Sequence, residues 1–318
     1  MTVSRSRSVR AFAPGHVTGV FRPDLAHRDP RGRGSVGAGV VLELGAWAEA
    51  RFVPGPRRRV RVLGDGPGPW PITEDVARRI APEEPGTLTV HVTHELPVGQ
   101  GFGMSAAGAL ATALAVGALS GHPHAHAVRV AHLADLFGGG GLGGVAAILG
   151  GGLEVRTRAG IPPLGSVVHR PFRPALLVGV VGPPIPSPTV LRDPSALRRI
   201  TRAARGWEEL GRDPTPERLF RFSERFTDVA GLASPAVART VRALRRQGAS
   251  ACQAMFGQSF FALPGSAPAR TACLDWLRGE GLRAVEIHAS ATGARVARPR
   301  SARVPLSSAS GTRAPQAF

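Results

Sequence analysis

A β-strand, a glycine-rich loop and an alanine-rich helix follow one another in the middle of the chain, and this run constrains the fold more than any other feature. Apolar and polar side chains alternate over residues 87–95, a period of two that predicts a strand with one buried face. Residues 97–104 are rich in glycine, and residues 105–119 are almost all alanine, glycine, leucine and valine. Because a helix of that composition is apolar all round, we expect it to be buried in an α/β unit.

The loop has the composition of an anion-binding loop. Gly99, Gly101 and Gly103 lack a Cβ, so their backbone N–H groups can approach a phosphate closely. The helix that follows adds unpaired N–H donors and the positive end of its dipole. Ser105 at the helix start is expected to cap the helix, to ligate Mg²⁺, or to do both.

Three known loops with a similar outline do not match. The Walker A loop needs a lysine, and the sequence contains none. The dinucleotide-binding fingerprint needs GxGxxG and an acidic residue about 20 positions later, whereas residues 118–124 contain no acidic side chain. The nucleophile elbow GxSxG needs glycine two positions after the serine, where this chain has Ala107. The pattern therefore belongs to a different loop family, or it is a glycine-rich turn before a packed alanine helix.

The PxxxGxGxSAA pattern of residues 97–107 resembles the phosphate loop of the GHMP kinases. Residues 11–21 (AFAPGHVTGVF) and 34–40 (GSVGAGV) resemble the N-terminal signature of one branch, the archaeal pantoate kinases. Residues 250–259 (SACQAMFGQS) lie where that family has its third motif. The resemblance covers roughly residues 9–290.

This resemblance implies an α/β fold of the two-domain α+β type, the GHMP kinase fold. The N-terminal domain would be ribosomal protein S5 domain 2-like and the C-terminal domain ferredoxin-like. We expect these domains over residues 1–165 and 166–293, with a disordered tail over 294–318. The family uses ATP to phosphorylate (R)-pantoate to 4-phosphopantoate on the route to coenzyme A.

The resemblance also implies roles for individual residues, with ATP and Mg²⁺ as cofactors. Ser105 and Asp135 fall at the catalytic and metal positions, and Ser35, His132 and Arg156 fall on the substrate side. His132 and Asp135 are three residues apart on a predicted helix, so both can point at one site. The implied nucleotide loop comprises Pro97, Gly99, Gly101, Gly103, Met104, Ser105 and Ala106.

Two positions depart from the family pattern: Asp135 stands where the family has a glutamate, and Gly144 is the more serious departure. The family's glycine segment reads TGLGD, whereas this chain ends the segment with Gly144. Phosphoryl transfer could proceed without that carboxylate at a reduced rate, or Asp135 could replace it. The third explanation is a degenerate kinase that binds nucleotide or metabolite without turnover. A kinase for another small hydroxy acid is a further alternative.

The net charge of +18 leaves a nucleic-acid binder as the last alternative. All 40 basic residues are arginine, and tyrosine is absent, which is typical of a genome biased toward GC-rich codons. The arginines are scattered with few aromatic side chains between them. We therefore expect the charge to follow from codon bias, with ATP and a small molecule as the partners.

The remaining features favour a cytoplasmic chain. Cys252 and Cys273 have no metal-binding spacing and fit a reducing compartment. No signal peptide is visible at the N-terminus. The longest apolar stretch, residues 106–121, is shorter than the roughly 20 residues that span a bilayer. We expect no membrane association, and the sequence leaves a homodimer open.

Overall fold

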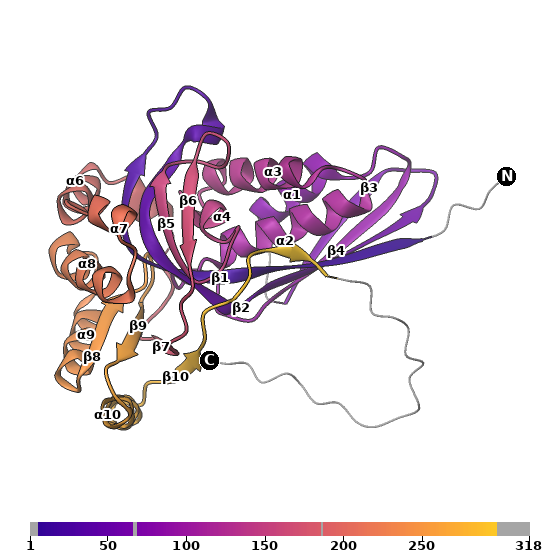
Figure 1. Ribbon diagram of the computed structural model, residues 1–318. Coiled ribbons are helices and arrows are strands. Elements are labelled where there is room, and N and C mark those ends of the chain that lie inside the picture. The colour runs from indigo at the N-terminus through magenta and orange to yellow at the C-terminus, as the bar shows by residue number, and fades with distance from the viewer. Residues whose placement is uncertain (1–5, 66–68, 186, 298–318) are drawn as a thin grey trace, which may run out of the picture.

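The computed structural model describes residues 6–65, 69–185 and 187–297 (Figure 1). Within these residues the strands form a seven-stranded and a four-stranded sheet. The seven-stranded sheet contains β1 (Arg7–Asp24), β2 (Gly34–Pro54), β3 (Arg59–Gly64), β4 (Gly86–His94), β5 (Leu153–Arg158), β6 (Ser166–Arg170) and β11 (Arg295–Val296). The four-stranded sheet contains β7 (Leu176–Val180), β8 (Ala249–Gln253), β9 (Ser259–Pro264) and β10 (Ala284–Ile287).

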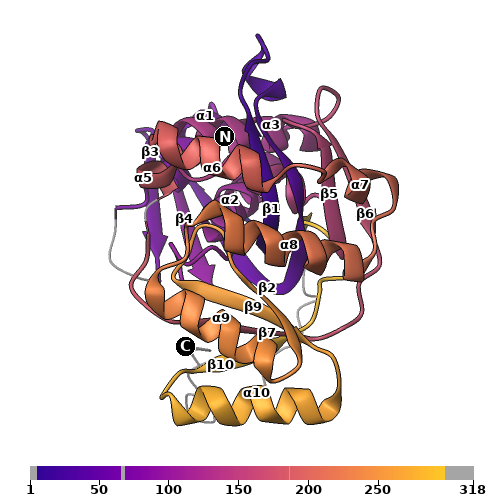
Figure 2. The same ribbon diagram turned by 90° about the vertical axis from the view of Figure 1, so that its left-hand side faces the viewer.

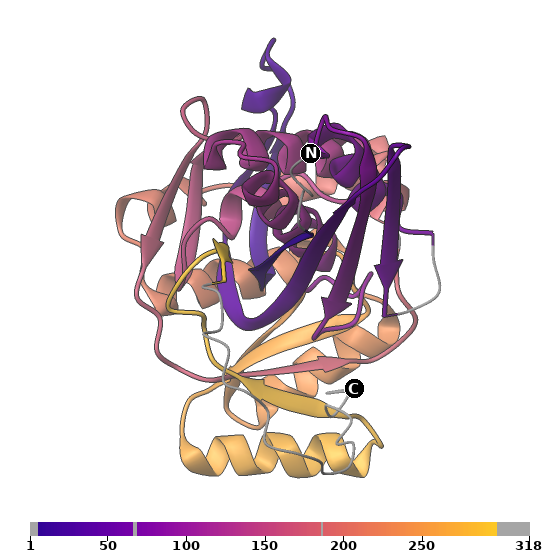
Figure 3. The ribbon, with the colours of Figure 1, turned by 90° about the vertical axis from the view of Figure 1, so that its right-hand side faces the viewer.

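The helices fall into two groups along the chain. With the first sheet belong the 3₁₀ turn η1 (Pro30–Gly32), α1 (Pro71–Ile80), α2 (Met104–Leu119), α3 (His124–Phe137) and the short α4 (Gly144–Ala147). After β7 come α5 (Ser187–Leu191), α6 (Pro194–Ala203), α7 (Glu208–Arg212), α8 (Pro216–Ala230), α9 (Pro235–Arg246) and, after β9, α10 (Ala267–Gly279). Helices α6, α7 and α8 of the second group also contact strands of the first sheet. Figures 2 and 3 show α10 at the opposite end of the molecule from α1 and α3.

The two longest strands, β1 and β2, pair antiparallel along their whole length. On its other side β2 changes neighbour, because its first part pairs with β5 and its second part with β4. Pro14 and Gly15 lie at a β-bulge within β1, where the missing N–H of proline is tolerated. Beside the bulge, the backbone N–H of His16 donates to the carbonyl of Phe102 (2.9 Å). This hydrogen bond, next to the bulge, connects β1 to the glycine loop.

Helix α2 is the buried helix that the composition predicts. Every residue except Ser105 and Ala118 is buried, and the helix packs on β1, β2, α1 and α3. Its small side chains let these neighbours approach closely, so the helix start is held at a fixed place relative to β1. The predicted strand, loop and helix are confirmed as β4, the residues after it and α2.

The second sheet has the strand order β10-β7-β9-β8, and all neighbours are antiparallel. If β7, β8, β9 and β10 are numbered 1 to 4, the order in the sheet is 4-1-3-2, and helices follow strands 1 and 3. That is the ferredoxin-like arrangement. The predicted two-domain fold class is therefore confirmed.

The sheet pairings change two predicted boundaries. Strand β6 pairs with β5 in the first sheet, so a boundary after residue 165 cuts that sheet. We propose that the domain boundary lies between β6 and β7. The prediction of a tail from residue 294 is wrong for its first residues, because the N–H of Ala294 donates to Ile148 and β11 pairs with β1. Residues 298–318 of the predicted tail lie outside the described residues.

Proline begins several helices of the second half of the chain. Pro194, Pro216 and Pro235 each occupy the first position of a helix, where the missing N–H costs nothing. Helix α1 also begins with a proline, Pro71, and Thr73 is buried within its first turn. No helix in the described part of the chain is long and apolar enough to cross a lipid bilayer.

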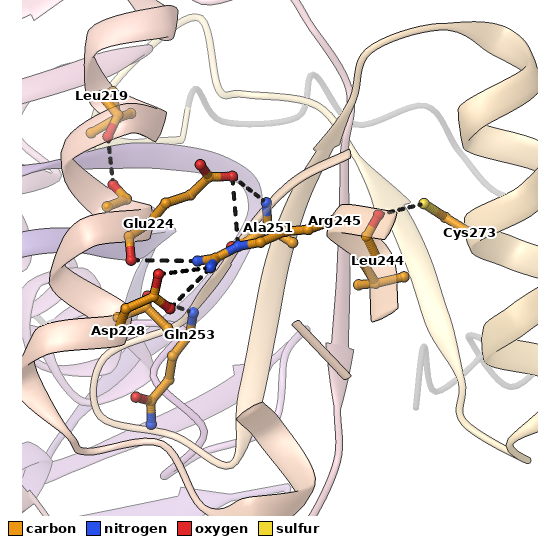
Figure 4. A network of polar contacts seen from close by, with 10 residues as sticks. Leu219, Glu224, Asp228, Leu244, Arg245, Ala251, Gln253 and Cys273 are labelled. Carbon is orange, nitrogen blue, oxygen red and sulfur yellow. Dashed lines mark hydrogen bonds and ion pairs between the residues drawn. The ribbon is translucent and has the colours of Figure 1, made fainter. Parts of the chain in front are cut away.

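Arg245, one of the scattered basic residues, has a structural role in the second domain (Figure 4). Its Nε donates to the carbonyl of Ala251 (2.9 Å), and its Nη1 donates to the carboxylate of Asp228 (2.9 Å). The N–H of Ala251 in turn donates to Glu224 (3.2 Å). These contacts join α8, α9 and β8, so this arginine is used inside the protein.

Candidate active site

A cavity of about 310 Å³ lies beside the start of α2. Its walls come from the glycine loop, a second glycine segment at residues 139–144, the strands β1, β2 and β5, and residues 255–256 of the second domain. Both domains therefore contribute to one cavity. Its volume is in the range of small-molecule sites.

The glycine loop has a conformation that favours glycine at three alternate positions. Gly99, Gly101 and Gly103 have φ values of 77°, 76° and 70°, a left-handed region that other residues rarely adopt. Gly103 is the N-cap of α2, and no side chain caps the helix. The prediction that Ser105 caps the helix is therefore wrong. Because Met104, Ser105 and the residue after them line the cavity, the uncapped first turn opens onto it.

The second domain holds the glycine loop in place. The hydroxyl of Ser259 donates to the carbonyl of Gln100, and the side-chain amide of Gln100 donates to the carbonyl of Gly182 (2.8 Å). The N–H of Ile185 donates to the carbonyl of Gly99 (3.2 Å). Ser259 belongs to the segment that resembles the family's third motif. That segment therefore supports the loop from the second domain.

Ser105 and Asp135 form a hydrogen-bonded pair at the helix end of the cavity. The Ser105 hydroxyl donates to Oδ1 of Asp135 (2.7 Å), and Asp135 is only 2% exposed. Burial raises the pKa of Asp135 to about 7, although hydrogen bonds from Ser105 and the backbone of Gly141 lower it. A carboxylate that burial makes costly to ionise is stabilised by a cation beside it.

Arg156, Glu154 and His16 form a second polar cluster beside the cavity. Oε1 of Glu154 accepts hydrogen bonds from Nη1 of Arg156 and from Nε2 of His16, the latter at 2.8 Å. All three side chains are buried. Burial raises the pKa of Glu154, but Arg156 and His16 together outweigh it and hold that pKa below its usual value. Nε of Arg156 has no hydrogen-bond partner among the described residues.

The second glycine segment lies across both clusters. A Cβ on Gly140 would overlap the carboxylate of Asp135 and the hydroxyl of Ser105. A Cβ on Gly143 would lie 2.6 Å from Oγ of Ser35 and 2.8 Å from Nε of Arg156. Both approaches require glycine, because real Cβ atoms are excluded at such distances. The segment thus lies against Asp135 at Gly140 and against Ser35 and Arg156 at Gly143, so the two clusters meet the cavity at different points.

Two residues predicted for the site do not line the cavity. Nε2 of His132 lies 3.4 Å from the carbonyl oxygen of Pro30, so this buried ring packs against η1. Pro97 precedes the part of the loop that forms the wall. The other predicted residues all line the cavity: Gly99, Gly101, Gly103, Met104, Ser105, Ala106, Asp135, Ser35 and Arg156.

Sequence reasoning missed His16, Thr18 and Glu154. His16 and Thr18 lie within the first family-like segment and both line the cavity. Glu154 is two residues before Arg156 on β5, a spacing that puts both side chains on one face of the strand. This spacing is the one sequence signal that could have pointed to Glu154. Its hydrogen bond to His16 joins residues 138 positions apart, and no local pattern indicates it.

The structure also bears on Gly144, where the family has aspartate. Gly144 begins α4, and a Cβ there would lie 2.6 Å from the Cβ of Ala106. We expect Gly144→Asp to lower the free energy of unfolding by about 1–3 kcal/mol, the usual cost of overpacking. Urea unfolding measures this. Adding Ala106→Gly should recover most of the loss, and equal stability of Gly144→Asp and the parent would contradict the contact.

Comparisons with known proteins agree with this geometry. A family model described as the GHMP kinases N terminal domain matches residues 72–152. The chain is similar to the curated pantoate kinase of Thermococcus kodakarensis, with 33% identity over 263 residues that cover 80% of this chain and 87% of that protein.

Two solved structures have the same fold. One, described as a phosphotransferase related to the CoA biosynthesis pathway, has a TM-score of 0.83 and 31% identity, and the match covers 93% of this chain and all of that one. The other, described as MDDEF in complex with MVAPP, AMPPCP and magnesium, has a TM-score of 0.65 and 14% identity, and the match covers 92% and 99% of the two chains. The second likeness concerns the fold alone.

Proposed function

The chain belongs to the pantoate kinases, a branch of the GHMP kinases, and we propose that its cavity transfers the γ-phosphoryl group of ATP to the 4-hydroxyl of (R)-pantoate. One observation carries the assignment of residues. A hydroxyl–carboxylate pair at an uncapped helix start and a buried arginine with an unpartnered Nε lie at two ends of one cavity. The first end suits phosphate and a cation, and the second suits a carboxylate.

The helix end of the cavity would hold ATP and Mg²⁺. The glycine loop and the first turn of α2 direct N–H groups at the phosphates. Ser105 and Asp135 offer two hard oxygen donors within 2.7 Å of each other, which fits a cation that takes one or two protein oxygens and completes its shell with phosphate and water. When bound, Mg²⁺ neutralises charge on the transferred phosphoryl group. Asp135 would be ionised in that state.

The other end of the cavity would hold pantoate. Arg156 lines the cavity, and its guanidinium plane suits a carboxylate. Ser35 lies beside it across Gly143 and adds a hydroxyl that can bond to the same substrate. Phe21 and Phe256 pack edge to face, with ring centroids 5.2 Å apart, on the same cavity wall. Their apolar surface suits the two methyl groups of pantoate.

We expect Ser105→Ala to lower kcat/KM for MgATP by on the order of 10²-fold, a typical loss for one electrostatic contact in an active site. Loss of the hydroxyl also removes a hydrogen bond that lowers the pKa of Asp135, so activity should require higher pH. Steady-state rates across pH measure both effects.

Ser120→Ala is the matched control for that variant. Ser120 lies at the other end of α2 and donates to the carbonyl of Ile80 (3.0 Å), so its loss should cost about 1 kcal/mol in stability without changing the rate. If Ser105→Ala, like the control, lowers stability without lowering the rate, Ser105 does not contact the nucleotide.

An ADP-release assay tests the function. Purified protein with ATP and Mg²⁺ is offered pantoate, homoserine, mevalonate or galactose, and pantoate is expected to stand out by at least tenfold in kcat/KM. Equal background rates with all four would reject the kinase assignment. The homodimer and the cytoplasmic location stay predictions.

A further inference from the structure

The cavity holds one proton acceptor to which the proposed function gives no role. Among the described residues that line the cavity, the titratable side chains are His16, Asp135 and Arg156. The guanidinium of Arg156 has donors only and no acceptor. Asp135 is committed to the cation and to the hydroxyl of Ser105. His16 is therefore the side chain left to receive a proton.

We propose that His16 is the general base that removes the proton from the pantoate hydroxyl, an inference that rests on the proposed function. The substrate O–H bond breaks as its oxygen forms a bond to the γ-phosphorus of ATP. The bond between that phosphorus and the bridging oxygen breaks, and ADP leaves with the electron pair. The proton moves to Nδ1 of His16 and passes to water after the products depart.

The hydrogen bonds around His16 determine which nitrogen is free. Glu154 is ionised because its pKa lies below the usual value, so it accepts a hydrogen bond and Nε2 of His16 must carry the hydrogen (2.8 Å). Nδ1 then has the free lone pair. Oγ1 of Thr18 lies 3.4 Å from Nδ1 and also lines the cavity. The lone pair therefore lies beside a hydroxyl that can pass on the substrate's proton.

The surroundings of His16 suit a base that works near neutral pH. Glu154 and Arg156 reach the imidazole from β5, and His169 reaches it from β6. Burial lowers the pKa of His16 below its usual value, although Glu154 raises it. The imidazole is neutral at pH 7 and ready to accept a proton. Glu154 is a positioning residue, since it orients the ring and stabilises the cation that forms.

The shared carboxylate oxygen also relates the base to the substrate anchor. His16 and Arg156 both donate to Oε1 of Glu154, so the two donating nitrogens lie within about 6 Å of each other. A substrate that reaches both must carry its carboxylate and its reacting hydroxyl only a few bonds apart. Short hydroxy acids such as pantoate satisfy this, and longer ones should be poorer substrates.

The test is His16→Asn, whose amide takes the place of the ring atoms next to Cγ and which has no basic nitrogen. We expect kcat to fall by about 10²–10⁴-fold, the usual loss for a general base. The KM for pantoate and the Kd for MgATP should stay within threefold. In the parent, kcat should decline at low pH with an apparent pKa below 6.5. The variant should lose the part of this decline that belongs to His16, while the part that comes from ionisation of Asp135 remains.

His94→Asn is the matched control. His94 is a buried histidine whose Nδ1 lies 3.2 Å from a carboxylate oxygen of Asp65, and it does not line the cavity. Its replacement should leave kcat and its pH profile unchanged. A fall in kcat for His94→Asn equal to that of His16→Asn would show that loss of a buried histidine is enough, and would overturn the proposal.

Other outcomes separate this proposal from the proposed function. A parent protein that releases no ADP with pantoate rejects the kinase assignment and, with it, this proposal. A parent that turns over while His16→Asn keeps its rate within threefold, or keeps a pH profile identical to that of the parent, overturns the role of His16 alone. If His16→Asn does not fold, Thr18→Val replaces it. Its kcat should fall about tenfold, and a kcat within threefold of the parent would overturn the proposal.

Discussion

Replacing Asp135 with asparagine is expected to reduce turnover by on the order of 10²–10³-fold while making the metal-free protein more stable above pH 7. The two effects have one cause. Asp135 is buried, and its pKa is raised to about 7 from a reference value of 3.8. The active site therefore contains a carboxylate that the fold alone does not favour in its charged form. A bound cation stabilises the charged form of this carboxylate.

The sign of the stability effect follows from the protons bound by each state. Between about pH 4 and pH 7 the unfolded chain releases the proton of Asp135 while the folded protein retains it, so stability falls as the pH rises. A shift of about 3 pKa units corresponds to roughly 4 kcal/mol. Asparagine does not titrate and still offers an oxygen to Ser105. We therefore expect Asp135→Asn to lose this pH dependence and to unfold at higher urea concentration at pH 8.

Urea unfolding at pH 5 and pH 8 measures the stability effect, and steady-state rates at saturating MgATP measure the catalytic one. Asp75→Asn is the control, because Asp75 is an exposed partner of Arg79 on α1 and such pairs contribute little. An Asp135→Asn protein with parental activity and a parental dependence of stability on pH would contradict both the burial argument and the metal role.

Arg156→Gln is expected to weaken pantoate binding by on the order of 10²-fold and to destabilise the fold by about 3–5 kcal/mol. The binding loss follows from removing a charge that pairs with the substrate carboxylate. The stability loss follows because Glu154, which is fully buried, keeps a negative charge without its main partner. The two effects need separate variants.

The double variant Glu154→Gln with Arg156→Gln separates them. Removing both charges should restore most of the stability, because no uncompensated buried charge remains. It should not restore pantoate binding, measured by calorimetry without nucleotide. Arg158→Gln at the exposed end of β5 is the control and should change neither quantity. If the double variant binds pantoate as tightly as the parent, Arg156 has a structural role only.

The phosphate end of the site could be predicted because its information is local. The alternation before residue 96, the three glycines and Ser105 all lie within about 20 consecutive residues of the sequence. Such short-range patterns determine strand, loop and helix start directly. The predicted role of Ser105 as a helix cap was wrong, because its hydroxyl donates a hydrogen bond to Asp135 on α3 and does not cap its own helix. A tertiary partner outcompeted the local one.

The substrate end could be predicted only in part, because its contacts are long-range. Arg156 was identified from the resemblance, but the partners that hold it depend on which strands pair. His16 reaches Glu154 because β1 continues past the bulge at Pro14 and pairs with β2, which in turn pairs with β5. Likewise β11 pairs with β1 over two residues only. No periodicity can be seen in a segment of that length.

The central claim is that this chain transfers a phosphoryl group from ATP to the 4-hydroxyl of pantoate, and phosphorus NMR of the reaction mixture tests it most directly. The protein is incubated with ATP, Mg²⁺ and (R)-pantoate, and samples are taken as ADP accumulates. The account predicts a new phosphomonoester signal, coupled to the methylene protons at C4, that grows in equal amount with ADP. Inorganic phosphate growing with ADP in place of that signal, or an unchanged ATP spectrum, would contradict it.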